Sequence, residues 1–172
     1  MFRMLKNRAA AMGTIATLLA EAEAIARRLG ADRPAAEHLV QAALELPDGT
    51  AARALARLGS PAQDFGAALE AQEADDLGRI GVHADRDRIG SALPEATPPG
   101  GIYRSEPSAQ ELFQAAGEDA RRGGGVLVGA HVLRAAASLE HGATARAFRR
   151  MGIARADLLA AASAEIETFG RA

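Results

Sequence analysis

Apolar residues recur at intervals of three and four positions near the start of the chain, which is the spacing of one face of an α-helix. One such stripe is made of Ile15, Leu18, Leu19, Ala22 and Ile25. It predicts a helix over residues 14–29, with Gly30 as its C-terminal stop. A second stripe predicts a helix with Pro34 in its first turn, where a missing N–H is tolerated; it is made of Leu39, Val40, Ala43 and Leu44.

Breaks in the pattern divide the following residues into two more helices. Asp48-Gly49 interrupts the apolar stripe, and Thr50 is suited to cap the helix that follows. Gly59-Ser60-Pro61 ends that helix before a fourth, which extends to Glu73. The first part of the chain therefore predicts four helices.

The same plan returns in the last third of the chain. Ser108 and Glu111 have the spacing of a capping box, in which the two side chains accept backbone N–H groups of the first turn. The run Gly123-Gly124-Gly125 ends the helix that starts there. Three further helices are predicted, over residues 129–139, 144–151 and 155–168.

The chain contains an internal repeat. Residues 38–59 match residues 131–152 without a gap, and ten of these 22 positions are identical. The matched positions are mainly helix stops and core faces, and a repeat of this length indicates a duplicated unit rather than a solenoid. We therefore predict an all-α fold for residues 1–172, a single domain of eight helices in two four-helix halves with pseudo-twofold symmetry.

The two predicted copies cover residues 12–73 and 105–168, and residues 74–104 differ from both in character. Part of this middle segment predicts one or two short helices, with apolar positions at Leu77, Ile80, Ile89 and Leu93. Pro98-Pro99 and Gly100-Gly101 then stop regular structure. We interpret the segment as a linker between the copies.

Composition agrees with closely packed helices, since 43 of the 172 residues are alanine and aromatic residues make up 3%. Cysteine is absent, which excludes disulfides and thiolate chemistry. The net charge of −2, with acidic and basic residues interspersed, lacks the basic face of a nucleic-acid binder. No apolar stretch reaches the roughly 20 residues of a membrane span, and the N-terminus lacks a secretory signal pattern, so we expect a cytoplasmic protein.

Several motifs resemble the Clp N-terminal repeat domain, which stands at the front of Clp-type AAA+ protein unfoldases. They are Glu37-His38-Leu39, the run Asp48 to Leu55, and Leu58-Gly59, each present again in altered form in the second copy. The resemblance covers residues 12–73 and 105–168. It implies the eight-helix fold and a role in receiving substrates and adaptors. The sequence has no Gly-Lys pair and hence no P-loop, so the chain resembles a stand-alone domain of this type.

The resemblance also indicates candidate ligand residues. Some family members bind phosphorylated arginine in two pockets, each with a Glu before the His and a Thr near the start of the first helix. Glu37 matches that Glu in the first copy, but Met12 stands at the Thr position, and in the second copy the positions hold Ala130 and Glu106. A carboxylate at Glu106 repels phosphate, which counts against phosphoarginine recognition. Tyr103 is the nearest match to an aromatic residue that precedes the second Thr.

Residues with catalytic potential have structural interpretations. His38 and His131 occupy equivalent places without a repeated acidic neighbour, so we expect each to bond backbone near a helix start. Asp75-Asp76 and Glu118-Asp119 are interpreted as solvated helix faces. His83 and His141 lack the spacing of a helical metal pair. We expect no enzyme activity, no cofactor and no metal.

Three functions follow from this reading. The first is a non-enzymatic binding module of the Clp system, which recognises protein or peptide segments, adaptors or a Clp unfoldase as an accessory, adaptor-like or decoy domain. The second is a small-molecule sequestering protein for cyclic peptide antibiotics, because the resemblance implies that some relatives are their targets. The third is a cryptic metal-dependent enzyme. Partners do not include nucleic acid or membrane, and the candidate ligand residues are Met12, Glu37, Glu106 and Tyr103.

Overall fold

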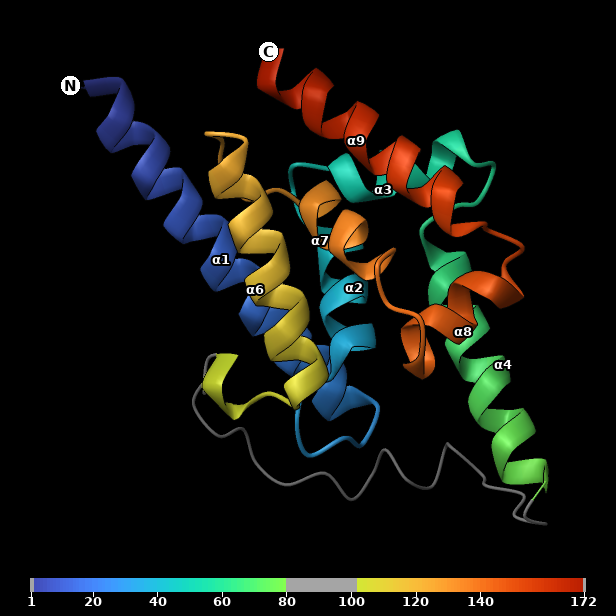
Figure 1. Ribbon diagram of the computed structural model, residues 1–172. Coiled ribbons are helices and arrows are strands. Elements are labelled where there is room, and N and C mark those ends of the chain that lie inside the picture. The colour runs from blue at the N-terminus through green and yellow to red at the C-terminus, as the bar shows by residue number, and fades with distance from the viewer. Residues whose placement is uncertain (1, 80–101, 172) are drawn as a thin grey trace.

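The computed structural model describes the backbone of residues 2–79 and 102–171, and this part of the chain has eight α-helices and no strand (Figure 1). The helices of the first copy are α1 (Phe2–Arg28), α2 (Ala36–Glu45), α3 (Thr50–Arg57) and α4 (Gln63–Arg79). After the short 3-10 helix η2 (Ile102–Arg104), those of the second copy are α6 (Pro107–Arg122), α7 (Gly129–Ala136), α8 (Gly142–Arg150) and α9 (Arg155–Arg171). The expected all-α fold is confirmed for the described residues.

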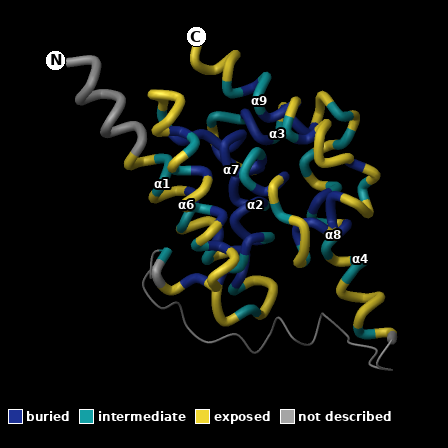
Figure 2. Tube along the Cα trace, viewed as in Figure 1, coloured by how far each residue is buried: buried dark blue, intermediate teal, exposed yellow. Residues whose placement is uncertain are grey.

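Helices α2 and α7 pack against each other at the centre of the molecule, where Figure 2 shows the chain almost entirely buried. Their apolar side chains are at most 1% exposed at Leu39, Val40, Val132 and Leu133. Helix α1 covers α2, and α6 covers both central helices. The many alanines on these helices allow the backbones to approach closely, as the composition predicts.

The last helix of each copy packs against the third helix of the other copy. Helix α4 lies on α8, where the rings of Phe65 and Phe148 meet at an interplanar angle of 40° with centroids 4.9 Å apart. Helix α9 lies on α3 and also on α7. Buried apolar residues from both copies therefore form one core.

Several helices are longer than the apolar pattern predicts. Helix α1 begins at Phe2 rather than Thr14, because residues 2–13 consist mostly of good helix formers. Helix α4 continues to Arg79 and includes Leu77 from the predicted linker. Helix α7, in contrast, ends at Ala136, three residues earlier than predicted.

The predicted position of Pro34 is wrong. Helix α2 begins at Ala36, with Ala35 as its N-cap residue, so Pro34 lies just before the helix. There its carbonyl accepts the Glu106 N–H at 2.8 Å, a bond between the two copies. The helix start is fixed instead by the side chain of His38, as described below.

Residues 80–101 of the predicted linker, which include Ile80, Ile89 and Leu93, lie outside the described residues, as does His83. Among the helices that the structure does describe, none combines the length and the apolar content needed to cross a bilayer.

Candidate binding site

Both repeated histidines bond backbone at a helix start, as predicted. His38 is the third residue of α2, and its Nδ1 accepts the Ala35 N–H at 2.9 Å. His131 holds the same place in α7, and its Nδ1 accepts the Val128 N–H at 3.2 Å. These bonds occupy the nitrogen that a base or metal ligand would use, and they require it to be unprotonated.

The histidine environments favour the neutral imidazole. Burial lowers the pKa of His38 below its ordinary value of 6.5, although the neighbouring Glu37 carboxylate acts in the opposite direction. Burial likewise lowers the pKa of His131, against a smaller opposing effect of Asp119. Both side chains are therefore uncharged helix caps near neutral pH.

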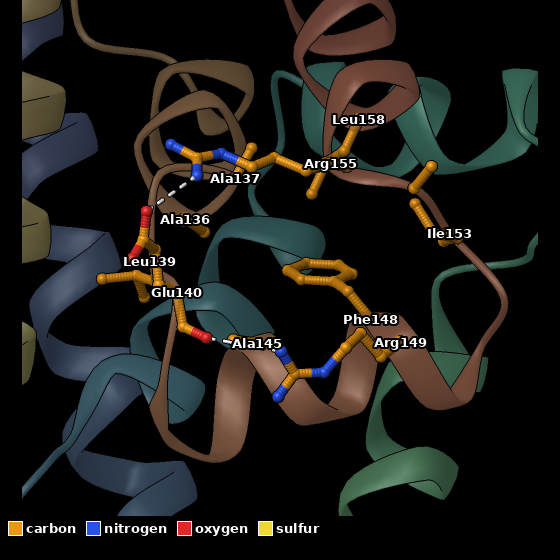
Figure 3. Close-up of a pocket in the computed structure, with 11 residues that line it drawn as sticks. Ala136, Ala137, Leu139, Glu140, Ala145, Phe148, Arg149, Ile153, Arg155 and Leu158 are labelled. Atoms are coloured by element: carbon orange, nitrogen blue, oxygen red, sulfur yellow. Dashed lines mark hydrogen bonds and ion pairs between the residues drawn. The ribbon is translucent and has the colours of Figure 1, made fainter.

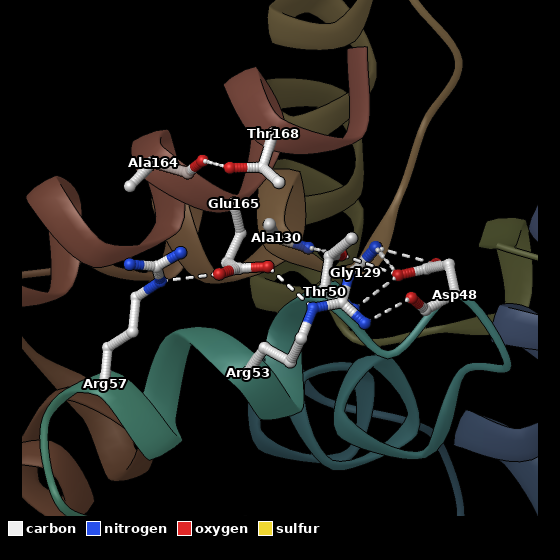
Figure 4. A network of polar contacts seen from close by, with 9 residues as sticks. All are labelled: Asp48, Thr50, Arg53, Arg57, Gly129, Ala130, Ala164, Glu165 and Thr168. Carbon is white, nitrogen blue, oxygen red and sulfur yellow. Dashed lines mark hydrogen bonds and ion pairs between the residues drawn. The ribbon is translucent and has the colours of Figure 1, made fainter. Parts of the chain in front are cut away.

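The start of α7 is capped by residues of the first copy (Figure 4). The Gly129 N–H donates to the Asp48 carboxylate, 3.1 Å from Oδ2, and the Ala130 N–H donates to Thr50 Oγ1 at 2.8 Å. Thr50 in turn donates its hydroxyl proton to Asp48 Oδ1 at 2.6 Å. A Cβ at Gly129 would lie 2.7 Å from the Ala43 carbonyl oxygen, so glycine permits this close approach.

Two predicted local caps are therefore wrong, because both side chains serve a helix of the other copy. Thr50 is the first residue of α3, whose N-cap is Gly49, and its hydroxyl caps α7. Ser108 lies inside α6, whose N-cap is Glu106, and its Oγ accepts the Ala36 N–H of α2 at 3.3 Å. The starts of the two central helices thus hold the copies together.

An ion cluster links α3 to α9 beside this cap. The Glu165 side chain is 3% exposed and accepts from Arg53 Nε at 2.8 Å and Arg57 Nε at 2.5 Å. Burial alone raises the pKa of Glu165, but the bonds from the two guanidiniums outweigh this effect and hold the pKa below 4.5. The carboxylate is therefore ionised and paired across the copies.

The corresponding place in the other half has the same two arginines but a different partner. Arg146 and Arg150 lie ninety-three positions after Arg53 and Arg57, whereas Gln72 replaces Glu165. The Gln72 amide faces the Arg146 guanidinium, and when it is oriented with its oxygen toward the donor this oxygen accepts from Nη2 at 2.8 Å. Asp75 pairs with Arg150 at 2.7 Å.

The acidic residues predicted to lie on solvated helix faces are exposed at Asp75, Asp76 and Glu118 and partly exposed at Asp119, and three of the four also form ion pairs. Asp75 bonds Arg150 as above, and Asp76 lies 3.9 Å from Arg146. Asp119 accepts from Arg134 Nε at 2.7 Å. These contacts join α4 to α8 and α6 to α7, so the acids have structural partners.

A groove of about 570 Å³ lies between α2 and α4, beside the start of α2. In the other half α9 packs onto α7, whereas α4 packs mainly onto α8 and leaves this space open. The apolar part of the lining is formed by Leu29, Leu69 and Leu77. The acidic part is formed by Glu37, Glu73 and Asp76.

The structure places the predicted ligand residues in different surroundings. Glu37 lines the groove, and Glu106 stands at the start of α6, whose backbone bonds Pro34 just before α2. Met12 is 70% exposed on α1. It lies 16 residues before the last residue of that helix, Arg28, and hence about 24 Å from the C-terminal end of α1 along the helix axis. Tyr103 lies in η2, which contacts α6.

One sequence pattern points weakly to the ion cluster. Arg53 and Arg57 are four residues apart on one helix face and recur at the same spacing in the second copy. Their partner Glu165 carries no such signal, because it comes from a helix more than one hundred residues away in the chain. No group of three or more potential metal-ligating side chains occurs among the described residues.

Comparison with protein-family models finds no match for this chain, and comparison with curated proteins finds none either. Function therefore rests on the chemistry of the site rather than on that of a relative.

Proposed function

We propose that this protein is a non-enzymatic module that binds protein or peptide segments, similar to the Clp N-terminal domain and with pseudo-twofold related halves. The internal repeat and the crossed packing of α4 on α8 and α9 on α3 support the duplicated arrangement. The neutral, backbone-bonded histidines support a binding role rather than acid-base catalysis.

The proposal rests on the groove between α2 and α4. It is large enough for several side chains and combines leucines with three carboxylates. An extended segment that bears both aliphatic and basic side chains is complementary to this lining, since the aliphatic part removes apolar surface from water and the basic part meets the acids. Such segments are exposed in unfolded proteins, which are the substrates of Clp unfoldases.

The direct test is fluorescence anisotropy with a labelled peptide that alternates leucine and lysine. We expect saturable binding that weakens several-fold in Glu37→Gln, because one carboxylate of the groove becomes neutral. Glu45→Gln is the matched control, since Glu45 is an exposed residue at the other end of the same helix. Equal affinity in both variants, or no saturable binding, contradicts the proposal.

The cellular role is tested by titrating the protein into a reconstituted Clp unfoldase–protease reaction. Inhibition indicates a decoy that competes for substrate, and stimulation indicates an adaptor. Unchanged degradation over the whole titration contradicts a role in the Clp system while leaving peptide binding to the anisotropy test.

A further inference from the structure

A second cavity, of about 400 Å³, lies where the end of α7, α8 and the start of α9 meet (Figure 3). Its floor is apolar, with Phe148, Ile153 and Leu158 exposed by 8% or less. Its volume suits two or three apolar side chains. The cavity shares no lining residue with the groove between α2 and α4, so the two sites are independent.

Charged groups stand at one side of this cavity. Arg155 Nη1 lies 3.4 Å from Glu140 Oε1, and Arg149 Nη1 donates to the Glu140 main-chain carbonyl at 3.3 Å. Figure 3 shows both guanidiniums turned toward Glu140. The two arginines and one carboxylate leave a net positive charge beside an apolar floor.

These contacts are weak enough to be exchanged for a ligand. The Arg155 and Glu140 side chains are 52% and 69% exposed, and exposed ion pairs contribute little because water and salt screen them. Arg149 bonds a neutral carbonyl in this cluster, so its charge is not balanced there by a second carboxylate. An incoming carboxylate therefore meets two guanidinium groups, which bind carboxylates through paired N–H donors.

The first copy of the repeat provides an internal comparison. The positions that match Glu140, Arg149 and Arg155 are Pro47, Ala56 and Ala62, which carry no charge. Ala137 also lines the floor of the cavity. The position that matches it in the first copy is Leu44, which is 7% exposed and has a larger side chain. The charged rim and the small floor residue thus occur together in the second copy and are both absent at the matched positions.

We propose that this cavity binds the carboxy terminus of a protein chain that ends in an aliphatic residue. The last side chains occupy the floor formed by Phe148, Ile153 and Leu158, and the terminal carboxylate bonds Arg149 and Arg155. The Glu140 carbonyl is an acceptor for a backbone N–H of the same terminus. A fatty acid has the tail and the carboxylate but lacks that N–H, so the rim matches a peptide terminus better.

The test is fluorescence anisotropy with an N-terminally labelled peptide that ends in Ala-Leu with a free carboxylate, and with the same peptide ending in a carboxamide. We expect the free acid to bind at least about tenfold more tightly, the effect of one or two charge-assisted hydrogen bonds. The double variant R149A/R155A is expected to remove this difference. Arg122→Ala, at the exposed end of α6, is the matched control and leaves it intact.

A gain of affinity provides a further readout. Glu140→Gln removes the carboxylate that competes for Arg155 but keeps the main-chain acceptor, so the free-acid peptide is expected to bind several-fold more tightly. A residue that merely supported the fold would not give this gain. Circular dichroism of each variant establishes that it is folded.

Four results would overturn the proposal. The first is equal affinity for acid and carboxamide, and the second is an acid preference that persists in R149A/R155A. The third is octanoate binding as tightly as the acid peptide, which would indicate a site for small carboxylates. Absence of saturable binding up to about 1 mM, the weak end of specific affinity, overturns it as well. Glu37→Gln leaves this site untouched, so failure here is separate from failure at the groove.

Discussion

Replacing Thr50 with valine tests whether the copies are held together through the start of α7. The Thr50 hydroxyl accepts the Ala130 N–H at 2.8 Å and donates to Asp48 at 2.6 Å, and both Thr50 and Ala130 are completely buried. Valine keeps the shape of threonine and removes the hydroxyl, so no cavity forms. The Ala130 N–H is left buried without an acceptor, which costs about 1–3 kcal/mol of the free energy of unfolding.

The chain offers a matched control in Thr144. Its side chain is also buried, yet its Oγ1 has no hydrogen-bond partner among the described residues. Replacing an unpaired buried hydroxyl with a methyl group removes a desolvation cost, so Thr144→Val is expected to be neutral or stabilising. The same chemical change therefore has opposite expected effects at the two positions.

Urea unfolding followed by circular dichroism measures both variants. For Thr50→Val, a loss of about 2 kcal/mol corresponds to a decrease in Tm of roughly 4–8 °C in a domain of this size. Thr50→Ser retains the hydroxyl and is expected to recover most of the loss. Equal changes in the free energy of unfolding for Thr50→Val and Thr144→Val would show that the hydrogen bond from the Ala130 N–H to Thr50 contributes nothing to stability.

Two further predictions concern the buried titratable groups. Because the pKa of His131 is lowered in the folded protein, its contribution to stability is complete above about pH 6.5 and is lost as the pH falls toward the lowered value. The free energy of unfolding, measured with urea at pH 7 and pH 5.5, should therefore change less with pH in His131→Gln than in the control His141→Gln. His141 is the control because its side chain is exposed. An equal change in both variants would contradict the neutral His131 cap. Glu165→Gln breaks the ion cluster with Arg53 and Arg57, and because both arginines are half-exposed the loss is discounted to about 1–2 kcal/mol. Since the pKa of Glu165 is lowered, this contribution exists above about pH 4.5 and disappears as the pH falls below it, so wild type and variant should converge in acid; a constant difference between them at every pH would show that the charge is not responsible.

Most helices could be predicted from local pattern, but the ends of some of them could not. Periodicity and glycine stops placed α2 and α6 within a few residues of their observed bounds, because these signals act between neighbours in the chain. The start of α1 was missed because residues 2–13 form helix through propensity rather than through an apolar stripe.

The groove beside Glu37 could not be predicted from the sequence. The sequence singled out Glu37 from a resemblance, but the space beside it exists because α4 packs on α8 instead of on α2. Packing of this kind depends on the shapes of several helices at once. Apolar spacing along a single helix does not specify it.

The pattern of apolar residues and glycines was enough to predict a helical chain and the approximate place of most of its helices. The sequence also identified the residues suited to cap helices, because Thr50 and Ser108 have side chains that accept an N–H. Which helix each of them caps depends on how the helices pack. The first N–H groups of any helix lack partners within it, and the residues that satisfy them here lie about seventy to eighty positions away in the chain, brought close by the packing of α2 against α7.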